Sequence, residues 1–266
     1  EVFLSLEKDN IIYLNNFLSD SKSSVCEYNF SYPLDMIYFE PTKGCNFKCI
    51  HCYASAPKIK NISGELNAQG LEELVKQIDE IGALEVCFTG GEPFFSNKTL
   101  EISKRFHDKG IKLGYITNGS LITNNLATEL EKLKPSFIRL SFHSNDRTKF
   151  NFITKTNKYN VVLKNLSSLM DQGIIPSISC TLFRGLNNSY EDISQFLSFF
   201  KERGFKATDI TFDEFVPDGC GLDIKDYQIN EEEDVKKISN AFKEVFDFSV
   251  SEKKSPLKSS YCGIGI

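Results

Sequence analysis

The feature that most constrains this chain of 266 residues is a regular alternation of two kinds of segment. From residue 36 onward, short runs rich in β-branched and aromatic residues precede longer runs whose apolar residues recur every three or four positions. Such alternation predicts strands and amphipathic helices that form βα units of a parallel sheet. We count six units, with strands at 36–40, 85–90, 112–118, 137–142, 175–182 and 209–215, and helices at 68–81, 98–109, 124–133, 160–172, 190–203 and 232–246.

Polar and glycine-rich segments follow the predicted strands. TGGEPF begins at residue 89, TNGS at 117, SFHSND at 141 and VPDGCG at 216. Six βα units fit an incomplete barrel or an open doubly wound sheet, and both folds place ligands at the carboxyl ends of the strands. We therefore expect these segments to lie on one rim and to form the functional site.

Composition excludes several kinds of partner. The chain carries 31 basic and 36 acidic residues, a net charge of −5, and the two signs are interspersed, so neither nucleic acid nor an anionic membrane surface is an expected partner. No apolar stretch reaches the roughly 18 to 20 residues of a membrane span, and the first residues do not resemble a signal peptide. We expect a cytoplasmic protein, in which eight cysteines do not indicate a disulfide framework.

Three of those cysteines, Cys45, Cys49 and Cys52, lie within eight residues, directly after the first predicted strand and a PTKG turn. Three thiolates from one loop can occupy three corners of an iron-sulfur cube and leave the fourth iron open to another molecule. Two alternatives stay open: the spacing also matches one face of a helix with buried free thiols, and thiols with a further ligand can bind zinc. The position after a strand and a turn favours the cluster.

At this point the chain resembles the radical S-adenosylmethionine (radical SAM) superfamily. CNFKCIHC matches the signature cysteine motif, with His51 where an aromatic residue is usual. GGEP at 90–93 and TNG at 117–119 match motifs after the second and third strands, and Ser141 matches a fourth-strand serine. His143 stands where many relatives have Asp. The resemblance implies a partial (β/α)6 TIM-like barrel.

The resemblance also implies two cofactors. A 4Fe-4S cluster would be bound by the three cysteines, and S-adenosylmethionine would be reduced on its open iron. A flavodoxin or ferredoxin would donate the electron. The methionine part of the cofactor would contact Gly90, Gly91, Glu92 and Pro93, and its ribose or carboxylate would contact Thr117, Asn118 and Ser141.

The branch that CYASA and the terminal YCGIGI resemble acts on peptides and carries a SPASM or twitch extension. Residues 1–33, which show no strand-helix alternation, would be an N-terminal extension, a remnant of a leader-peptide-binding domain. Residues 34–248 would form the barrel, and residues 249–266 a linker and a truncated extension in which Cys262 begins an auxiliary cluster. The substrate would be a precursor peptide that is crosslinked or epimerised. A radical enzyme for a small-molecule cofactor precursor and a non-enzymatic metal-binding module are the alternatives.

Three further residues are candidates for catalysis. Alternation along the last strand places Asp213 on the opposite face to Glu214, so one carboxylate is expected to point into the barrel as a base or an anchor for a peptide amide. The competing interpretation places both carboxylates on the solvated rim. His143 and Cys220 are candidates because they follow the fourth and sixth strands. Cys87 and Cys180 lie within strand patterns, which predicts buried packing residues.

Overall fold

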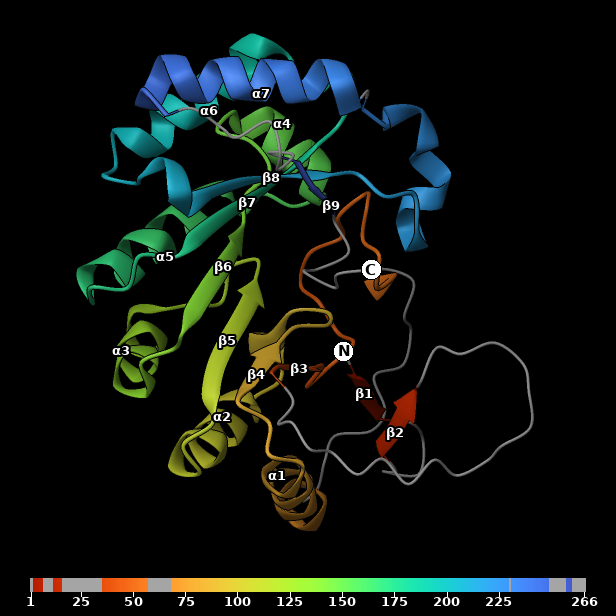
Figure 1. Cartoon of the computed structure of the whole chain (residues 1–266), viewed down its shortest axis with the longest axis vertical. Coiled ribbons are helices and arrows are strands. Elements are labelled where there is room, and N and C mark those ends of the chain that lie inside the picture. Colours follow the sequence, from red (N-terminus) through yellow and green to blue (C-terminus); the bar gives the residue numbers. More distant parts are fainter. Residues whose placement is uncertain are drawn as a thin grey trace.

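A computed structural model of the chain describes residues 2–6, 12–15, 35–56, 68–229, 231–248 and 257–259. The strands of this part form a single sheet in the order β2-β1-β3-β4-β5-β6-β7-β8-β9. Helices lie along the outer side of the curved sheet, and its inner side faces the loop that follows β3 (Figure 1). The fold is the predicted α/β partial barrel.

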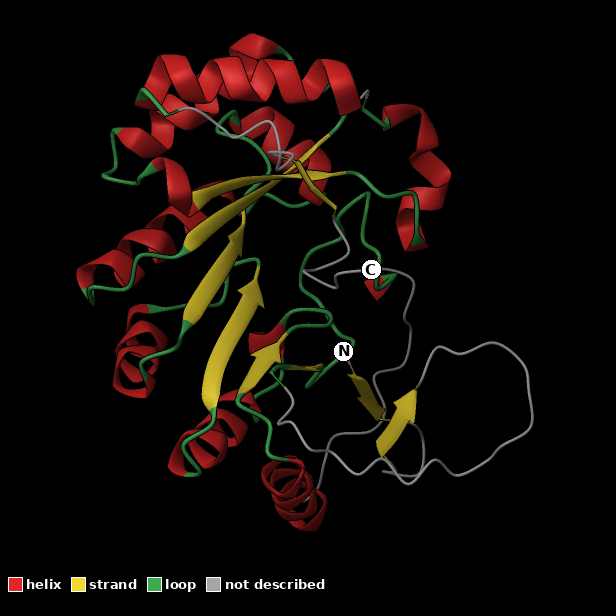
Figure 2. Ribbon diagram, viewed as in Figure 1, coloured by secondary structure: helices red, strands yellow, loops and turns green. Residues whose placement is uncertain are grey.

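All six predicted strands are present, and each pairs in parallel with the next. Their carboxyl ends therefore point the same way, and the row of strands does not close (Figure 2). This arrangement brings the segments after the strands to one rim, as the sequence predicts. The strands are β3 (Ile37–Phe39), β4 (Glu85–Phe88), β5 (Lys112–Thr117), β6 (Phe137–Ser141), β7 (Ser177–Leu182) and β8 (Ile210–Glu214).

The six predicted helices are also present. Two of them begin with hydroxyl caps: the side chain of Thr123 accepts a hydrogen bond from the N–H of Leu126, and that of Ser189 accepts one from Asp192. Such caps satisfy backbone donors that the first turn leaves without partners. The helices are α1 (Ala68–Ile81), α2 (Thr99–Asp108), α3 (Asn124–Leu133), α5 (Tyr159–Asp171), α6 (Tyr190–Lys201) and α7 (Glu231–Phe246).

The structure adds elements that the sequence analysis missed. An antiparallel pair, β1 (Val2–Leu6) and β2 (Ile12–Asn15), extends the sheet beside β3, within the segment that shows no strand-helix alternation. A short strand, β9 (Leu257–Ser259), pairs with β8 inside the predicted linker. A further helix, α4 (Arg147–Thr154), follows β6. Short 3-10 helices are η2 (Pro93–Phe95), η3 (Ala207–Asp209) and η4 (Gly219–Tyr227).

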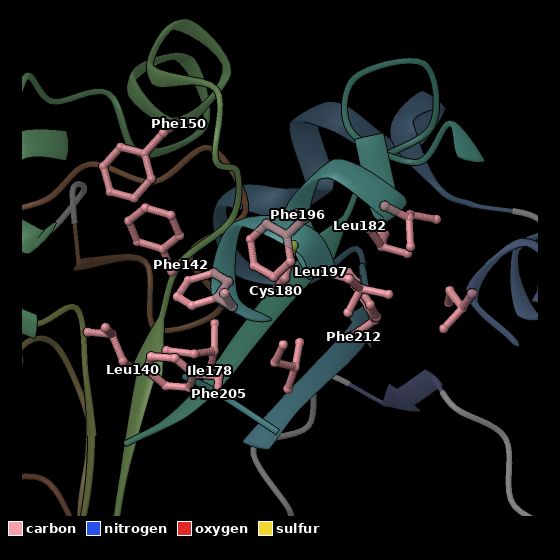
Figure 3. Close-up of a cluster of buried hydrophobic side chains, with 14 of the residues drawn as sticks. Leu140, Phe142, Phe150, Ile178, Cys180, Leu182, Phe196, Leu197, Phe205 and Phe212 are labelled. Carbon is pink, nitrogen blue, oxygen red and sulfur yellow. The ribbon is translucent and has the colours of Figure 1, made fainter. Parts of the chain in front are cut away.

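Each strand of the wall formed by β6, β7 and β8 has one apolar and one polar face. The apolar side chains pack against the outer helices in a cluster rich in phenylalanine (Figure 3). Cys180 lies in this cluster and Cys87 is also fully buried, so both are packing residues as predicted. The alternate side chains face the inside of the barrel and line a cavity, and they are Arg139, Ser141, Ser179, Thr181 and Asp213.

No helix in the described ranges is long and apolar enough to cross a membrane.

Candidate active site at the carboxyl ends of the strands

A cavity of about 200 Å³ lies inside the barrel at the carboxyl ends of the strands. The three cysteines after β3 line it together with residues that follow β4, β5 and β6 and residues of β7 and β8. Segments far apart in the sequence therefore meet around one volume. The predicted site residues on its wall are Cys45, Cys49, Cys52, Gly90, Gly91, Thr117, Asn118, Ser141, His143 and Asp213.

The cysteine loop is an irregular segment fixed by neighbouring backbone. Residues 45–52 form a bend and a turn and no helix, so the interpretation as one face of a helix is wrong. The N–H groups of Lys48 and Ile50 donate to the carbonyls of Thr154 and Ile153 at the end of α4, at 3.1 and 2.9 Å. The end of α4, a helix that the sequence did not predict, thus fixes the backbone of the cysteine loop.

Burial makes the three thiols hard to ionise. It raises the pKa of Cys45 to about 11, and it raises the pKa of Cys49 and of Cys52 as well. The sulfur of Cys45 accepts hydrogen bonds from the N–H of Phe47 at 3.4 Å and from the side chain of Asn118 at 3.7 Å. Thiols in such surroundings fit a cationic metal centre, because ligation offsets the cost of the thiolate charge.

The GGEP turn lies against the cysteine loop. The N–H of Gly91 donates to the carbonyl of Thr42 at 3.1 Å, and the N–H of Glu92 donates to the carbonyl of Gly44 at 2.8 Å. A Cβ atom on Gly91 would lie 2.1 Å from the carbonyl oxygen of Gly44, so only glycine permits this approach. The two segments therefore form one backbone unit.

Glu92 is 1% exposed and lies behind the cavity wall rather than on it. Its carboxylate accepts hydrogen bonds from the hydroxyl of Thr117 at 2.7 Å, the N–H of Asn118 at 2.8 Å and the N–H of Phe94 at 3.3 Å. Burial raises the pKa of this carboxyl to about 7, against the lowering effect of these donors. Glu92 thus links the turn after β4 to the end of β5. Pro93, which begins η2, is also buried behind the wall.

Asn46, which the sequence analysis did not single out, completes a small amide network. Its Oδ1 accepts a hydrogen bond from Nδ2 of Asn118 at 3.0 Å, and its Nδ2 donates to the hydroxyl of Ser120 at 2.8 Å. The N–H of Ser120 in turn donates to Oδ1 of Asn118 at 2.9 Å. The network orients the Asn118 side chain toward the cysteine loop, and its signal in the sequence is the amide directly after Cys45.

Asp213 points into the barrel and is 6% exposed. Its carboxylate accepts a hydrogen bond from the hydroxyl of Ser179, one strand away. Glu214 is half-buried and does not line the cavity, whereas Phe212 packs among the outer helices. The alternation along β8 is therefore as predicted, and the interpretation of both carboxylates as solvated rim charges is wrong.

The rings of His51 and His143 meet edge to face, with centroids 4.7 Å apart. Burial lowers the pKa of His51 to about 4, and burial together with the neighbouring His51 holds the pKa of His143 well below its usual range. Nδ1 of His143 accepts a hydrogen bond from the N–H of Thr181 at 3.2 Å, which assigns the ring proton to Nε2. His51 also contacts Phe183, so it packs as the aromatic residue it replaces.

Cys220 lies in η4, under the cysteine loop. Its N–H donates to the carbonyl of Cys52 at 2.9 Å, and its side chain is buried and does not line the cavity. The preceding Gly219 has a φ of 56°, and a Cβ atom there would lie 2.3 Å from the carbonyl oxygen of Tyr53. The structure thus places Cys220 as a support of the loop. Cys262 lies outside the described residues.

The family model of the radical SAM superfamily matches residues 39–199, from β3 into α6. The chain belongs to the radical SAM superfamily. It is therefore an enzyme that uses a 4Fe-4S cluster and S-adenosylmethionine, and the alternative of a non-enzymatic module is set aside. The cavity fits both groups: three half-buried thiols from one loop line it and suit the cube, and the neighbouring GGEP turn and Asn118 offer polar groups to the cofactor.

The curated relatives of this radical SAM protein are named as enzymes of small molecules. The Fe-coproporphyrin III synthase of Methanosarcina barkeri is 26% identical over 55% of this chain and 37% of its own length. The GTP 3′,8-cyclase of Marinobacter nauticus is 26% identical over 71% of this chain and 56% of its own length. The chain thus spans about half the length of the curated relatives that it matches.

Two solved structures share the fold. The structure titled native anSMEcpe with bound AdoMet has a TM-score of 0.63 and 21% identity, and covers 79% of this chain and 59% of its own. Streptococcus suis SuiB bound to the precursor peptide SuiA has a TM-score of 0.66 and 17% identity, and covers 95% of this chain and 58% of its own. At these identities the likeness shows the partial barrel, and the substrate of this chain is a separate question.

Proposed function

We propose that this radical SAM enzyme abstracts a hydrogen atom from a peptide, in the maturation of a ribosomally synthesised peptide. The observation that carries the proposal is the buried Asp213, which shares one cavity with the three cysteines. A carboxylate there can accept a hydrogen bond from a peptide amide or receive a proton. Solved structures of the same fold with a bound peptide, such as SuiB with SuiA, add support.

In this proposal the two ends of the cavity have different partners. Cys45, Cys49 and Cys52 would hold the cluster, which would supply the electron for reductive cleavage of S-adenosylmethionine. Gly90 and Gly91 offer backbone groups to the methionine part. Thr117, Asn118 and Ser141 lie near the ribose or the carboxylate of the cofactor.

Glu92 acts in a different manner from the direct contact expected from the sequence. Its carboxylate already accepts three hydrogen bonds inside the protein, from Thr117, Asn118 and Phe94. We therefore assign it a positioning role, in which it orders the backbone that faces the cofactor. We assign Pro93 a positioning role too, because it is buried and begins the 3-10 helix that follows Glu92.

The opposite wall of the cavity belongs to the substrate in this proposal. Ser179 donates its hydroxyl to Asp213 and so fixes the orientation of the carboxylate. His143 is neutral and offers Nε2–H as a donor, because Nδ1 already accepts from Thr181. These buried groups exclude water from the reacting carbon, which a radical needs in order to avoid other hydrogen donors. A flavodoxin or ferredoxin as electron donor stays a prediction.

The test is co-expression with a short peptide encoded beside the gene, followed by mass spectrometry of that peptide. The proposal predicts a loss of two hydrogen masses for a crosslink, or deuterium incorporation from heavy water for an epimerisation. A matched culture with Cys49→Ala is expected to leave the peptide unmodified. An unmodified peptide beside an enzyme that makes 5′-deoxyadenosine would contradict the peptide substrate.

The second candidate is a radical enzyme for a small molecule. The observation that favours it is the sequence similarity to proteins named GTP 3′,8-cyclase and AdoMet-dependent heme synthase, at 26–27% identity. Incubation of the reduced enzyme with small-molecule extracts separates the candidates. Production of 5′-deoxyadenosine that rises with the extract, and not with the peptide, supports this alternative.

A further inference from the structure

Arg139 is a basic residue inside the barrel to which the proposed function gives no role. It lies in β6, two residues before Ser141, and its side chain lines the same cavity. Its Nε is buried and has no hydrogen-bond partner within the described part of the chain. A buried N–H group of a charged side chain costs stability when it has no hydrogen-bond acceptor. The position of Arg139 therefore favours a ligand that accepts hydrogen bonds from the guanidinium.

The strand register gives the depth of Arg139. Arg139 pairs with Ser177 of β7, whereas Asp213 pairs with Thr181 of the same strand. The two positions on β7 differ by four residues, or roughly 13 Å along the strand. Ser141, at the level of Ser179, lies between them. Arg139 is therefore at the deep end of the barrel, below the layer that faces the cofactor.

The charges of the cavity favour one kind of anion. Among the described residues that line it, Arg139 carries the guanidinium, and Asp213 and Asp218 carry the carboxylates. A single planar guanidinium matches the two oxygens of a carboxylate. A phosphate dianion would bring two further negative charges into a cavity that already holds the Asp213 and Asp218 carboxylates, whereas a carboxylate brings one. The site thus suits a monoanion.

We propose that Arg139 binds a carboxylate of the substrate at the deep end of the barrel. Two sources carry this chemistry: a Glu or Asp side chain of a peptide, and the carboxylate of a small organic acid. The inference rests on the proposed function, in which the wall with Ser179 and Asp213 faces the substrate, and it extends the substrate from that wall to the deep end of the cavity. Binding itself requires no radical reaction, so a failure to form 5′-deoxyadenosine and a failure to bind a carboxylate are separate results.

Calorimetry on the unreduced holoenzyme tests the proposal. The protein is saturated with S-adenosylmethionine first, so that the carboxylate of the cofactor is already bound. The probes are propionate, its neutral analogue propionamide, inorganic phosphate, and two blocked peptides, N-acetyl-Ala-Glu-Ala-amide and its Gln counterpart. We expect a carboxylate probe to bind and the neutral ones and phosphate to bind at least about tenfold more weakly.

Variants connect the binding to the residue. Arg139→Gln is expected to lower the affinity for the carboxylate probe at least about tenfold. Arg139→Lys is expected to lower it less, because Lys keeps the charge and loses the paired N–H donors of the guanidinium. Arg147→Gln, at an exposed position of α4, is the matched control with full affinity. Iron content and circular dichroism establish that each variant is folded. If Arg139→Gln does not fold, the affinity of Arg139→Lys carries the test.

The outcomes are distinct. Tighter binding of the Glu peptide than of propionate supports the proposal with a peptide as source, and binding of propionate alone supports it with a small acid. Equal affinity of Arg139→Gln and the wild type would overturn it. So would binding of propionate only in the absence of S-adenosylmethionine, because Arg139 would then hold the carboxylate of the cofactor.

Discussion

The N–H of Asn118 donates a 2.8 Å hydrogen bond to the carboxylate of Glu92, while the side chain of Asn118 reaches the sulfur of Cys45 at 3.7 Å. One residue thus connects the turn after β4, the end of β5 and the cysteine loop. A substitution of Glu92 therefore changes the position of Asn118 on the cavity wall, although Glu92 itself does not line the cavity.

Glu92→Gln tests this connection. Gln keeps the size but presents an NH₂ group toward donors, so at least one of the hydrogen bonds from Thr117 and Asn118 is lost. A hydrogen bond to a charged group contributes about 1.5–3 kcal/mol, so we expect about tenfold weaker binding of S-adenosylmethionine. Anaerobic calorimetry measures it, with the exposed Glu131→Gln as control. Unchanged affinity in a variant with full iron content would remove Glu92 from this role.

The pH dependence of stability gives a second test of Glu92. Burial raises its pKa from 4.5 to about 7 in the folded protein, so the folded state holds a proton that the unfolded state has released. The free energy of unfolding therefore falls as the pH rises from about 5 to about 7, by on the order of 3 kcal/mol. In Glu92→Gln this part of the fall is absent. Denaturant unfolding at several pH values measures this free energy for both proteins. An equal fall in the wild type and in Glu92→Gln between pH 5 and pH 7 would contradict the assignment.

Gly91→Ala tests the contact between the GGEP turn and the cysteine loop. The added Cβ would meet the Gly44 carbonyl oxygen at 2.1 Å, so the loop must shift and we expect iron incorporation to fall severalfold. Gly173→Ala is the matched control, since Gly173 has a φ of 77° and open space around it. It carries backbone strain of about 1–2 kcal/mol far from the loop. Equal iron contents in the two variants would show that the contact is not needed.

Asp213→Asn separates the two ends of the cavity. We expect product formation to fall about a hundredfold or more while the uncoupled formation of 5′-deoxyadenosine persists, because the carboxylate faces the substrate in our proposal. Glu214→Gln, on the other side of β8, is the control and is expected to retain turnover. Full product formation by Asp213→Asn, or joint loss of cofactor cleavage and turnover, would exclude a substrate-specific role.

The sequence was sufficient for the six βα units because each strand and helix carries its own hydrophobic period. It was insufficient for α4, whose run from Arg147 to Thr154 is short and mostly polar. It was also insufficient for β1, which pairs with the distant strand β3, and for β2, which joins the sheet only through β1. The predicted bounds match the structure at both ends of α1, where Gly82 follows with a φ of 72°, and of α3, where Lys134 takes the left-handed conformation.

The site was predictable where a motif fixes the residue types and not where side-chain direction decides. The three cysteines, Gly90 and Asn118 lie on the cavity as expected. Glu92 does not, because the direction of a side chain in a tight turn depends on backbone angles that no periodicity encodes. Arg139 was missed although the alternation along β6 places it on the same face as Ser141, which was the signal available.

The most direct test of the central claim is the anaerobic assay of reconstituted, dithionite-reduced protein with S-adenosylmethionine. The account predicts about four irons per chain, formation of 5′-deoxyadenosine and methionine, and loss of both products in Cys45→Ala, Cys49→Ala and Cys52→Ala. Stoichiometric zinc without iron, or no 5′-deoxyadenosine from an iron-loaded wild type, would contradict it.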